Sequence, residues 1–318
     1  MATINSVLGP VDTRDLGFTL SHEHMWVTAA GISQTYPEFL DLEAAKDGAV
    51  KDLKAAYDEA GLRTYVDMTT FDIGRDVVAL EEVSRRTGLQ IIATAGFHRT
   101  IPRVFWMASP DAVAALFVRE IEEGIDGTEI KAGVLKAAGG TGSLSEQEEI
   151  VHRAVARAHL RTGVPIFTHT EQPDGIGLEQ IRVFQEEGVD LNRVLIGHAN
   201  DSTDVDYLQR MLDKGVWLGL DRYPGGRWAG SADWEQRTAT AKKLIDAGYA
   251  DRLTISHDWA NSQCRPSLAD REIRDRNNPD GYLFITRQVL PRLRELGANE
   301  ADIHKLTVDN PRRLFEGS

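Results

Sequence analysis

Two histidines separated by one residue, His22 and His24, have a spacing suited to metal binding. The residues before them alternate between apolar and polar from Leu16 to Ser21, which predicts a β-strand. Residues i and i+2 of a strand point to the same face, so both imidazoles would project side by side. Such a pair can bind a metal ion with little ordering cost, but an isolated His-x-His also fits two surface or hydrogen-bonded histidines. The choice depends on whether other ligands reach the same place.

Other side chains that bind metals or transfer protons follow further apolar segments. The chain contains nine histidines. Those at or just past the ends of later predicted strands are His98, His169, His198 and His257. Asp258 follows the last of these strands, and Lys136 lies within the apolar run 133–138. We expect four imidazoles (His22, His24, His169 and His198) and Asp258 to form a metal site, in preference to separate structural roles.

Lys136 has three interpretations, because a bare cation inside an apolar strand is costly. It could be a Schiff-base nucleophile. It could be the partner in a buried ion pair. Its neutral amine could also react with carbon dioxide to give a carbamate, an anion with two oxygens able to bridge two metal ions. Burial lowers a lysine pKa and favours this reaction, and the nearby histidines favour it over the other two.

The elements that position these residues alternate regularly along the chain. We predict strands near 64–69, 89–95, 131–137, 164–169, 193–198, 216–221 and 253–257, after a first strand ending at His24. Helices are predicted near 41–59, 76–86, 110–123, 145–161, 177–187, 204–214, 234–247, 281–296 and 300–305. Eight strand–helix units predict an α/β fold, a (β/α)8 TIM barrel in one domain over residues 1–318, after a short hairpin that turns at Gly9-Pro10.

An open doubly wound sheet is the alternative architecture. The glycine-containing stretches 124–127 and 139–140 lack the spacing of phosphate or dinucleotide loops, so the barrel is preferred. In a barrel, chemistry gathers at the C-terminal ends of the strands, and the candidate residues fall there.

Composition limits the partners. The net charge of −13 argues against nucleic acid or an anionic membrane surface. No apolar run approaches the roughly 20 residues of a membrane span, and residues 1–5 carry no signal-peptide pattern. The single cysteine, Cys264, fits a reducing compartment, so we expect a cytoplasmic protein.

Six motifs in this order and spacing resemble the phosphotriesterase family of the amidohydrolase superfamily, including its lactonases. The motifs are 22–24 (His-Glu-His), 132–136, 168–170, 196–198, 219–223 and 256–259, and the stretch 70–76 adds to them. The resemblance implies a (β/α)8 barrel with two divalent metal ions, usually zinc, with cobalt, manganese or iron tolerated. It also implies a homodimer.

The resemblance assigns roles position by position. His22, His24 and Asp258 would hold the more buried ion, and His169 and His198 the more exposed one. Lys136, as the carbamate, would bridge the two ions together with a hydroxide, and Asp258 would take the hydroxide's proton.

The subfamily signals are mixed. Arg222-Tyr223 resembles the lactonases, whereas residues 278–281 and 70–76 resemble the phosphotriesterases proper. His98 replaces the tyrosine or tryptophan of these groups, and with Arg99 it suits a polar or anionic substrate, unless Arg99 points to solvent.

Expected catalytic residues are Asp258, Lys136, Arg222 and Tyr223, and expected substrate contacts are Trp26, Phe71, His98, Arg99, Trp228 and Trp259, with Trp106 a further candidate.

These residues predict a metal-dependent hydrolase in which a bridging hydroxide attacks a lactone or related carboxylic ester, with organophosphate triesters as a secondary activity. A phosphotriesterase as the main activity is the alternative. A metal-free Schiff-base lyase using Lys136 and a non-catalytic binding protein are the rivals from other classes.

Overall fold

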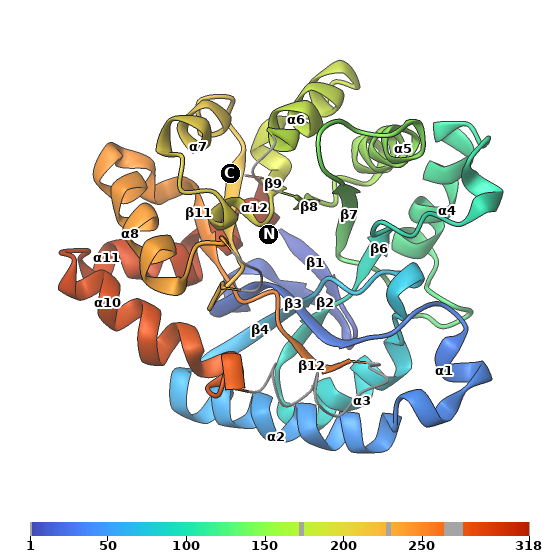
Figure 1. The fold of residues 1–318 in the computed structure, drawn as a ribbon. Helices are drawn as coiled ribbons and strands as arrows, with labels where there is room; N and C mark the ends of the chain where they lie inside the picture. Colours follow the sequence, from blue (N-terminus) through green and yellow to red (C-terminus); the bar gives the residue numbers. More distant parts are fainter. Residues whose placement is uncertain (1, 172–174, 227–229, 264–275, 318) are drawn as a thin grey trace.

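The structure is a computed structural model that describes residues 2–171, 175–226, 230–263 and 276–317. In this part of the chain, parallel strands form a barrel surrounded by a layer of helices (Figure 1). Trp228 and Cys264, both discussed above, lie outside the described residues.

The barrel strands pair in parallel in two hydrogen-bonded sets. One set has the order β12 (Ala260–Gln263), β3 (Phe18–Val27), β4 (Leu62–Asp67), β5 (Gln90–Ile92). The other has the order β11 (Leu253–Ile255), β10 (Trp217–Leu220), β9 (Val194–Ile196), β8 (Ile166–Thr170), β7 (Val134–Gly139), β6 (Thr94–Gly96).

Two junctions close the ring. β5 and β6 are successive halves of one predicted strand and are separated only by Ala93, so they join the two sets. On the opposite side, the N–H of Asp258 donates to the carbonyl of His22 (3.0 Å), and the N–H of His24 donates to the carbonyl of Trp259 (2.8 Å). The predicted (β/α)8 barrel is therefore confirmed.

Apart from two short helices at 32–35 and 310–316 that the sequence did not predict, the helices lie close to their predicted ranges. They are α1 (Ile32–Thr35), α2 (Leu42–Ala60), α3 (Val77–Thr87), α4 (Pro110–Glu122), α5 (Glu146–Thr162), α6 (Ile176–Glu186), α7 (Val205–Leu212), α8 (Trp234–Leu244), α10 (Leu290–Glu295), α11 (Glu300–His304) and α12 (Asn310–Glu316). The helix predicted near 281–296 begins as a 3-10 turn, η9 (Gly281–Leu283), and a π-helical turn, η10 (Ile285–Val289), before α10.

Local capping explains why these boundaries were predictable. Asp or Ser side chains at 41, 76, 109, 145, 204 and 233 each accept the N–H of the third helical residue. Glycines 61, 88 and 163 end helices in the left-handed conformation, which lacks a steric penalty for glycine. These caps depend on neighbouring residues alone.

The N-terminal hairpin is present, but the predicted turn at Gly9-Pro10 is wrong. β1 (Thr3–Ser6) pairs with β2 (Gly9–Asp12), and the turn consists of Val7 and Leu8. The Ser6 hydroxyl donates to the Gly9 carbonyl (2.8 Å) and accepts the Leu8 N–H (3.3 Å). This side-chain bridge and the positive φ of Gly9 move the reversal two residues earlier.

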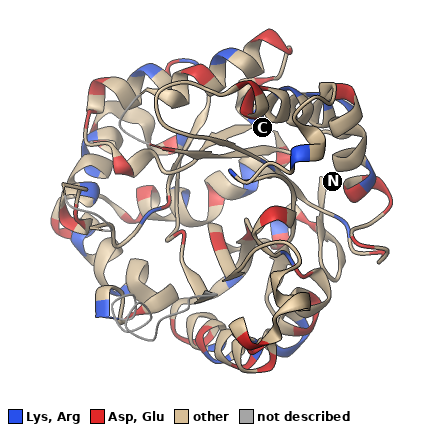
Figure 2. Ribbon diagram, turned by 45° about the vertical axis from the view of Figure 1, so that its right-hand side comes forward, with Lys and Arg blue, Asp and Glu red and all other residues tan. Residues whose placement is uncertain are grey.

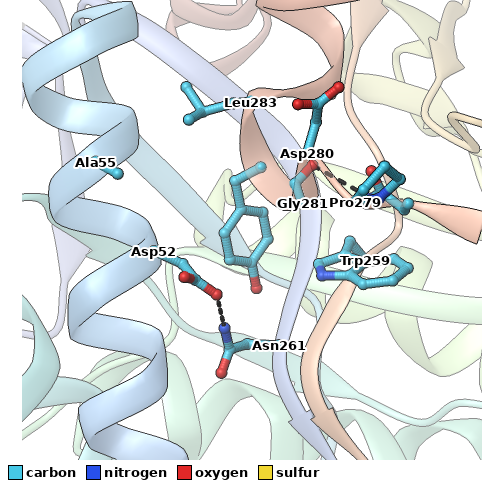
Figure 3. A pocket seen from close by; sticks show the side chains of 10 residues that line it. Asp52, Ala55, Trp259, Asn261, Pro279, Asp280, Gly281 and Leu283 are labelled. Carbon is cyan, nitrogen blue, oxygen red and sulfur yellow. Dashed lines mark hydrogen bonds between the residues drawn. The ribbon is translucent and has the colours of Figure 1, made fainter. Parts of the chain in front are cut away.

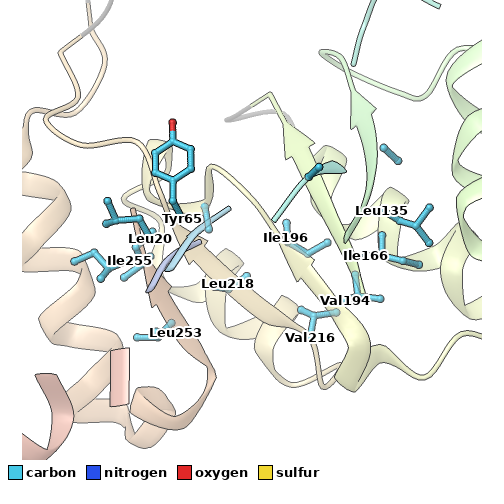
Figure 4. Packing of buried hydrophobic residues seen from close by; sticks show 14 of the residues in the cluster. Leu20, Tyr65, Leu135, Ile166, Val194, Ile196, Val216, Leu218, Leu253 and Ile255 are labelled. Atoms are coloured by element: carbon cyan, nitrogen blue, oxygen red, sulfur yellow. The ribbon is translucent and has the colours of Figure 1, made fainter. Parts of the chain in front are cut away.

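Alternation along the strands creates two apolar layers. Outward-facing residues such as Leu135, Ile166, Ile196 and Leu218 belong to the main cluster between the strands and the helices (Figure 4). A second cluster fills the floor of the barrel and includes Ile4, Val11, Leu16, Val66, Met68, Ile92, Val134, Phe167, Leu195, Trp217, Leu314 and Phe315. Above this floor, the same inward-facing rows continue with polar residues.

Charged residues are distributed along the helices that surround the barrel, with positions of Arg and Lys next to positions of Asp and Glu (Figure 2). An example is Arg153 on α5, which contacts Glu149 of the same helix and Glu186 of α6. Within the described ranges, no helix combines the length and apolarity needed to cross a membrane.

Candidate metal centre

The candidate ligands lie where the strands end. Lys136 is two residues after the floor residue Val134 on β7, and His169 is two residues after Phe167 on β8. Period-two alternation therefore places each polar side chain above an apolar one, facing the barrel interior.

Three of the candidates meet at the closing seam of the barrel. His22 and His24 come from β3, and Asp258 follows β11. Asp258 Oδ1 lies 3.3 Å from His24 Nε2 and 3.7 Å from His22 Nε2. One ligand atom from each residue falls within 4.8 Å of the other two, and both histidines are buried. This group matches the expected site for the more buried ion.

His169 and His198 form the neighbouring pair. His169 Nδ1 lies 2.8 Å from His198 Nε2, and the two rings meet edge to face. Burial lowers the pKa of both imidazoles well below the ordinary value, so both are neutral. His22 links the two groups because its ring lies 4.8 Å from that of His198.

Hydrogen bonds at the rear of the rings fix which nitrogen faces the centre. His198 Nδ1 lies 2.9 Å from Asp221 Oδ1, and His169 Nε2 lies 3.0 Å from Glu171 Oε1. Ionised carboxylates only accept, so beside ionised Asp221 and Glu171 these nitrogens carry the protons and the other two carry lone pairs. Two lone pairs 2.8 Å apart repel each other unless a positive charge lies nearby. The donor set therefore fits a bound cation.

Oxygen atoms also lie close to the rear nitrogens of the other two histidines. His24 Nδ1 contacts the Thr69 hydroxyl at 2.9 Å, and His22 Nδ1 lies 3.1 Å from Asp221 Oδ2. Burial, with the neighbouring Lys136 charge, lowers the pKa of His22 to about 3. Oxygen partners behind neutral imidazoles are the usual outer support of a metal site.

Lys136 sits at the junction of the two groups. Its Nζ lies 3.4 Å from His22 Nε2 and donates to the Met68 carbonyl at 3.0 Å. The side chain is fully buried, and burial lowers the pKa of Lys136 to about 8 despite the nearby Asp258 carboxylate. A substantial fraction of its amine is therefore neutral and nucleophilic near physiological pH.

Two of the candidate ligands have unusual backbone conformations. His198 and Asp258 have φ values of 61° and 50°, a region that residues with a Cβ rarely adopt. Such conformations cluster at functional sites because the surrounding contacts maintain them. Both residues lie shortly after strands, His198 after β9 and Asp258 after β11, so the bend turns the side chain toward the centre.

Asp221 is a site residue that the sequence did not identify as a ligand. It is fully buried and forms a second compact group with His22 and His198. Burial raises the pKa of Asp221 well above its ordinary value. The sequence feature that could have identified Asp221 is its position directly after β10, where the other candidate ligands also follow their strands. Glu171, two residues after His169, was also missed.

Arg222 connects the centre to a buried row of charges. Its Nε donates to Asp258 Oδ2 (3.2 Å) and its Nη1 to Asp201 Oδ2 (2.6 Å). Arg237, which is fully buried, contacts Asp201 Oδ1 at 2.6 Å.

Tyr223 is fully buried in the main apolar cluster, and burial raises its pKa to about 12. Its catalytic role stays a prediction.

His98 contacts His169, and Arg99 contacts Glu171, the carboxylate partner of His169. His98 Nε2 is 3.2 Å from His169 Nδ1, and Arg99 Nη1 donates to Glu171 Oε1 at 3.2 Å. Asp72 accepts the backbone N–H groups of His98 (2.9 Å) and Thr100 (3.2 Å) and so fixes this loop. Arg99 is thus ion-paired, although its side chain is 46% exposed.

The predicted aromatic contacts separate into different environments. Phe71 is exposed and packs edge to face on Phe97, and Trp106 is exposed with its indole N–H on the Ile101 carbonyl. Trp26 is buried within the main apolar cluster. Trp228 lies outside the described residues.

Trp259 lines a separate pocket of about 250 Å³ between α2, β12 and η9 (Figure 3). Asp52 and Asn261, joined by a 2.7 Å hydrogen bond, form part of its wall. The proposed contact of Trp259 with substrate stays a prediction.

Comparisons with known proteins agree with this geometry. The model of the phosphotriesterase family matches residues 2–315. A phosphotriesterase homology protein of Mycobacterium tuberculosis is 38% identical over 99% of this chain and 98% of that protein. An aryldialkylphosphatase of Saccharolobus solfataricus is 35% identical over 96% of each chain. An N-acetyltaurine hydrolase of Salmo salar is 25% identical over 98% of this chain and 97% of that protein. These relationships indicate a hydrolase, and the chain belongs to the phosphotriesterase family.

Proposed function

We propose that this protein is a hydrolase with two divalent metal ions, zinc by preference, that opens lactones or related carboxylic esters. The observation that carries the proposal is the convergence of four neutral imidazoles, Lys136 and Asp258 at one end of the barrel. His22, His24 and Asp258 would hold one ion, and His169 and His198 the other. When bound, the ions would lower the pKa of a water and polarise the substrate oxygen.

Lys136 completes the donor set as a carbamate. Its neutral amine attacks the carbon of CO₂, a nitrogen–carbon bond forms, and one proton leaves to solvent. The product carries one negative charge on two oxygens, where a protonated lysine would place a cation among the ligands. The depressed pKa of Lys136 supports this step, because only the neutral amine reacts.

Asp258 is the group placed to move protons. Arg222 holds its Oδ2, which leaves Oδ1 facing the two imidazoles of β3. We infer that Asp258 accepts the proton lost by the attacking water and returns it to the leaving alkoxide. His98 and Arg99 would contact the polar part of the substrate beside His169.

The lactone preference rests on Arg222-Tyr223 following the β10 strand. A phosphotriesterase as the main activity is the second candidate, and the 35% identity to an aryldialkylphosphatase favours it. Values of kcat/KM for a lactone panel, paraoxon-type triesters and N-acetyltaurine test whether lactones are preferred to phosphotriesters. A kcat/KM for triesters that exceeds the value for lactones by orders of magnitude would make phosphotriester hydrolysis the main activity.

Metal analysis tests the chemistry itself. We expect about two transition-metal equivalents per chain in the purified protein. Borohydride trapping of a substrate on Lys136 without metal would instead support a lyase.

A further inference from the structure

Glu23 lies between the two histidines of β3 and has no role in the proposed chemistry. His22 and His24 face the barrel interior, so the intervening Glu23 points to the opposite side of the strand. Its side chain is fully buried. A carboxylate in such a place is costly unless donors surround it, so its partners indicate what it does.

Those partners all come from the segment that carries Asp258. Glu23 Oε1 accepts the Ser256 hydroxyl (2.7 Å) and the His257 N–H (2.8 Å), and it lies 2.6 Å from His257 Nδ1. Glu23 Oε2 accepts the Trp259 N–H at 3.0 Å. The carboxylate thus holds the residues on both sides of Asp258.

The backbone of β3 holds Asp258 itself. The Asp258 N–H donates to the His22 carbonyl (3.0 Å), between the two N–H groups that Glu23 accepts. Three consecutive N–H groups, at residues 257, 258 and 259, are therefore bound by residues 22 and 23. This arrangement supports the left-handed φ of 50° at Asp258, a conformation that is uncommon for residues with a Cβ.

His257 extends the same support outward. It is fully buried, and its Nε2 accepts the Ile285 N–H at 3.3 Å, where η10 begins. Tyr282 of η9 donates its hydroxyl to the His24 carbonyl at 2.9 Å. The segment 281–285 therefore packs behind both strands that carry the seam ligands.

We propose that Glu23, with His257, is a positioning residue that maintains the strained conformation of Asp258 and thereby its place beside His22 and His24. Glu23 binds no metal in this proposal, because its carboxylate faces away from the imidazoles. The proposal rests on the metal centre described above.

Glu23→Gln tests it, since glutamine keeps the shape but replaces one acceptor oxygen with an NH₂ group. Zinc affinity is measured by chelator competition on wild type and variant. We expect at least one of the two equivalents to bind about 10- to 100-fold more weakly, the usual effect of removing an outer support. At saturating zinc, kcat should fall while KM stays near the wild-type value.

Two further variants separate positioning from general destabilisation. His257→Asn keeps a donor close to the position of Nδ1 and should retain zinc affinity better than His257→Leu. Glu187→Gln removes a partly buried partner of Arg153 and Arg157 on the helical layer, so it should leave both zinc affinities unchanged.

The outcomes are distinguishable. A wild-type protein that binds no metal would contradict the proposed function. A wild-type protein that binds two equivalents, beside a Glu23→Gln variant with the same affinities and kcat, would overturn the positioning role alone. A crystal structure of that variant with Asp258 still at positive φ would overturn it as well.

Discussion

Lys136 should react with carbon dioxide at a pH where an exposed lysine does not. Burial lowers its pKa from 10.5 to about 8. At pH 7 the neutral fraction is then about 9%, against about 0.03% for an exposed lysine, from the ordinary titration relation. The structure thus gives an increase of about 300-fold in reactive amine.

The pH dependence follows from the same numbers. In protein stripped of metal by chelation, the carbamylation rate should rise about tenfold per pH unit below pH 8 and level off above it. An exposed lysine would continue to rise to about pH 10.5. The rate can be followed by ¹³C NMR with labelled CO₂, at a fixed concentration of dissolved CO₂ because bicarbonate equilibria also change with pH.

Lys136→Ala is the control, and its spectrum should lack the carbamate signal that belongs to Lys136. A rate that keeps rising tenfold per unit between pH 8 and 10 would refute the reasoning, because the amine would then titrate as if it were exposed.

Three other predictions concern the same charges. Lys136→Ala should abolish hydrolysis, and propionate should restore part of it by supplying a carboxylate; full activity without rescue would contradict the bridging role. Lys136→Met should raise the free energy of unfolding of the chelator-treated protein by up to about 3 kcal/mol at pH 7. The pKa of Lys136 is lower in the folded state than in the unfolded state, so the unfolded state binds more protons between pH 8 and 10.5. The stability gained by Lys136→Met should therefore shrink as the pH rises through that window, which denaturant titrations at several pH values would measure. Arg237→Met should lower kcat about tenfold, because it removes one of the two arginines that hold Asp201, and Asp201 in turn positions Arg222; unchanged kcat would exclude this coupling.

The barrel and the convergence of the candidate ligands could be predicted because their signals are local or periodic. Helix caps such as Asp41 and Gly61 lie beside the helices they end. Strand ends follow from apolar runs, and the barrel topology brings them to one face. Lys136 and His169 could therefore be placed together without any knowledge of contacts.

The supporting residues could not be predicted in this way. Glu23 and the His257 N–H it accepts are 234 positions apart, so no local pattern connects them. In the sequence, Asp221 resembles any other aspartate at the end of a strand. Only the structure shows that His22 and His198 lie next to it. Period-two alternation places Trp26 on the same strand face as His24, but it does not show how deeply the Trp26 ring is packed in the main apolar cluster. The expected contact of Trp26 with substrate stays a prediction.

The floor of the barrel has a consequence for folding in the cell. Ile4 and Val11 from the start of the sequence pack in one cluster with Leu314 and Phe315 from its last helix. The Thr13 hydroxyl also donates to Glu316 at 2.8 Å. Synthesis proceeds from the N-terminus, so this cluster cannot form until α12 has left the ribosome. Until then the nascent barrel exposes apolar surface at its base, which makes it a candidate for chaperone binding.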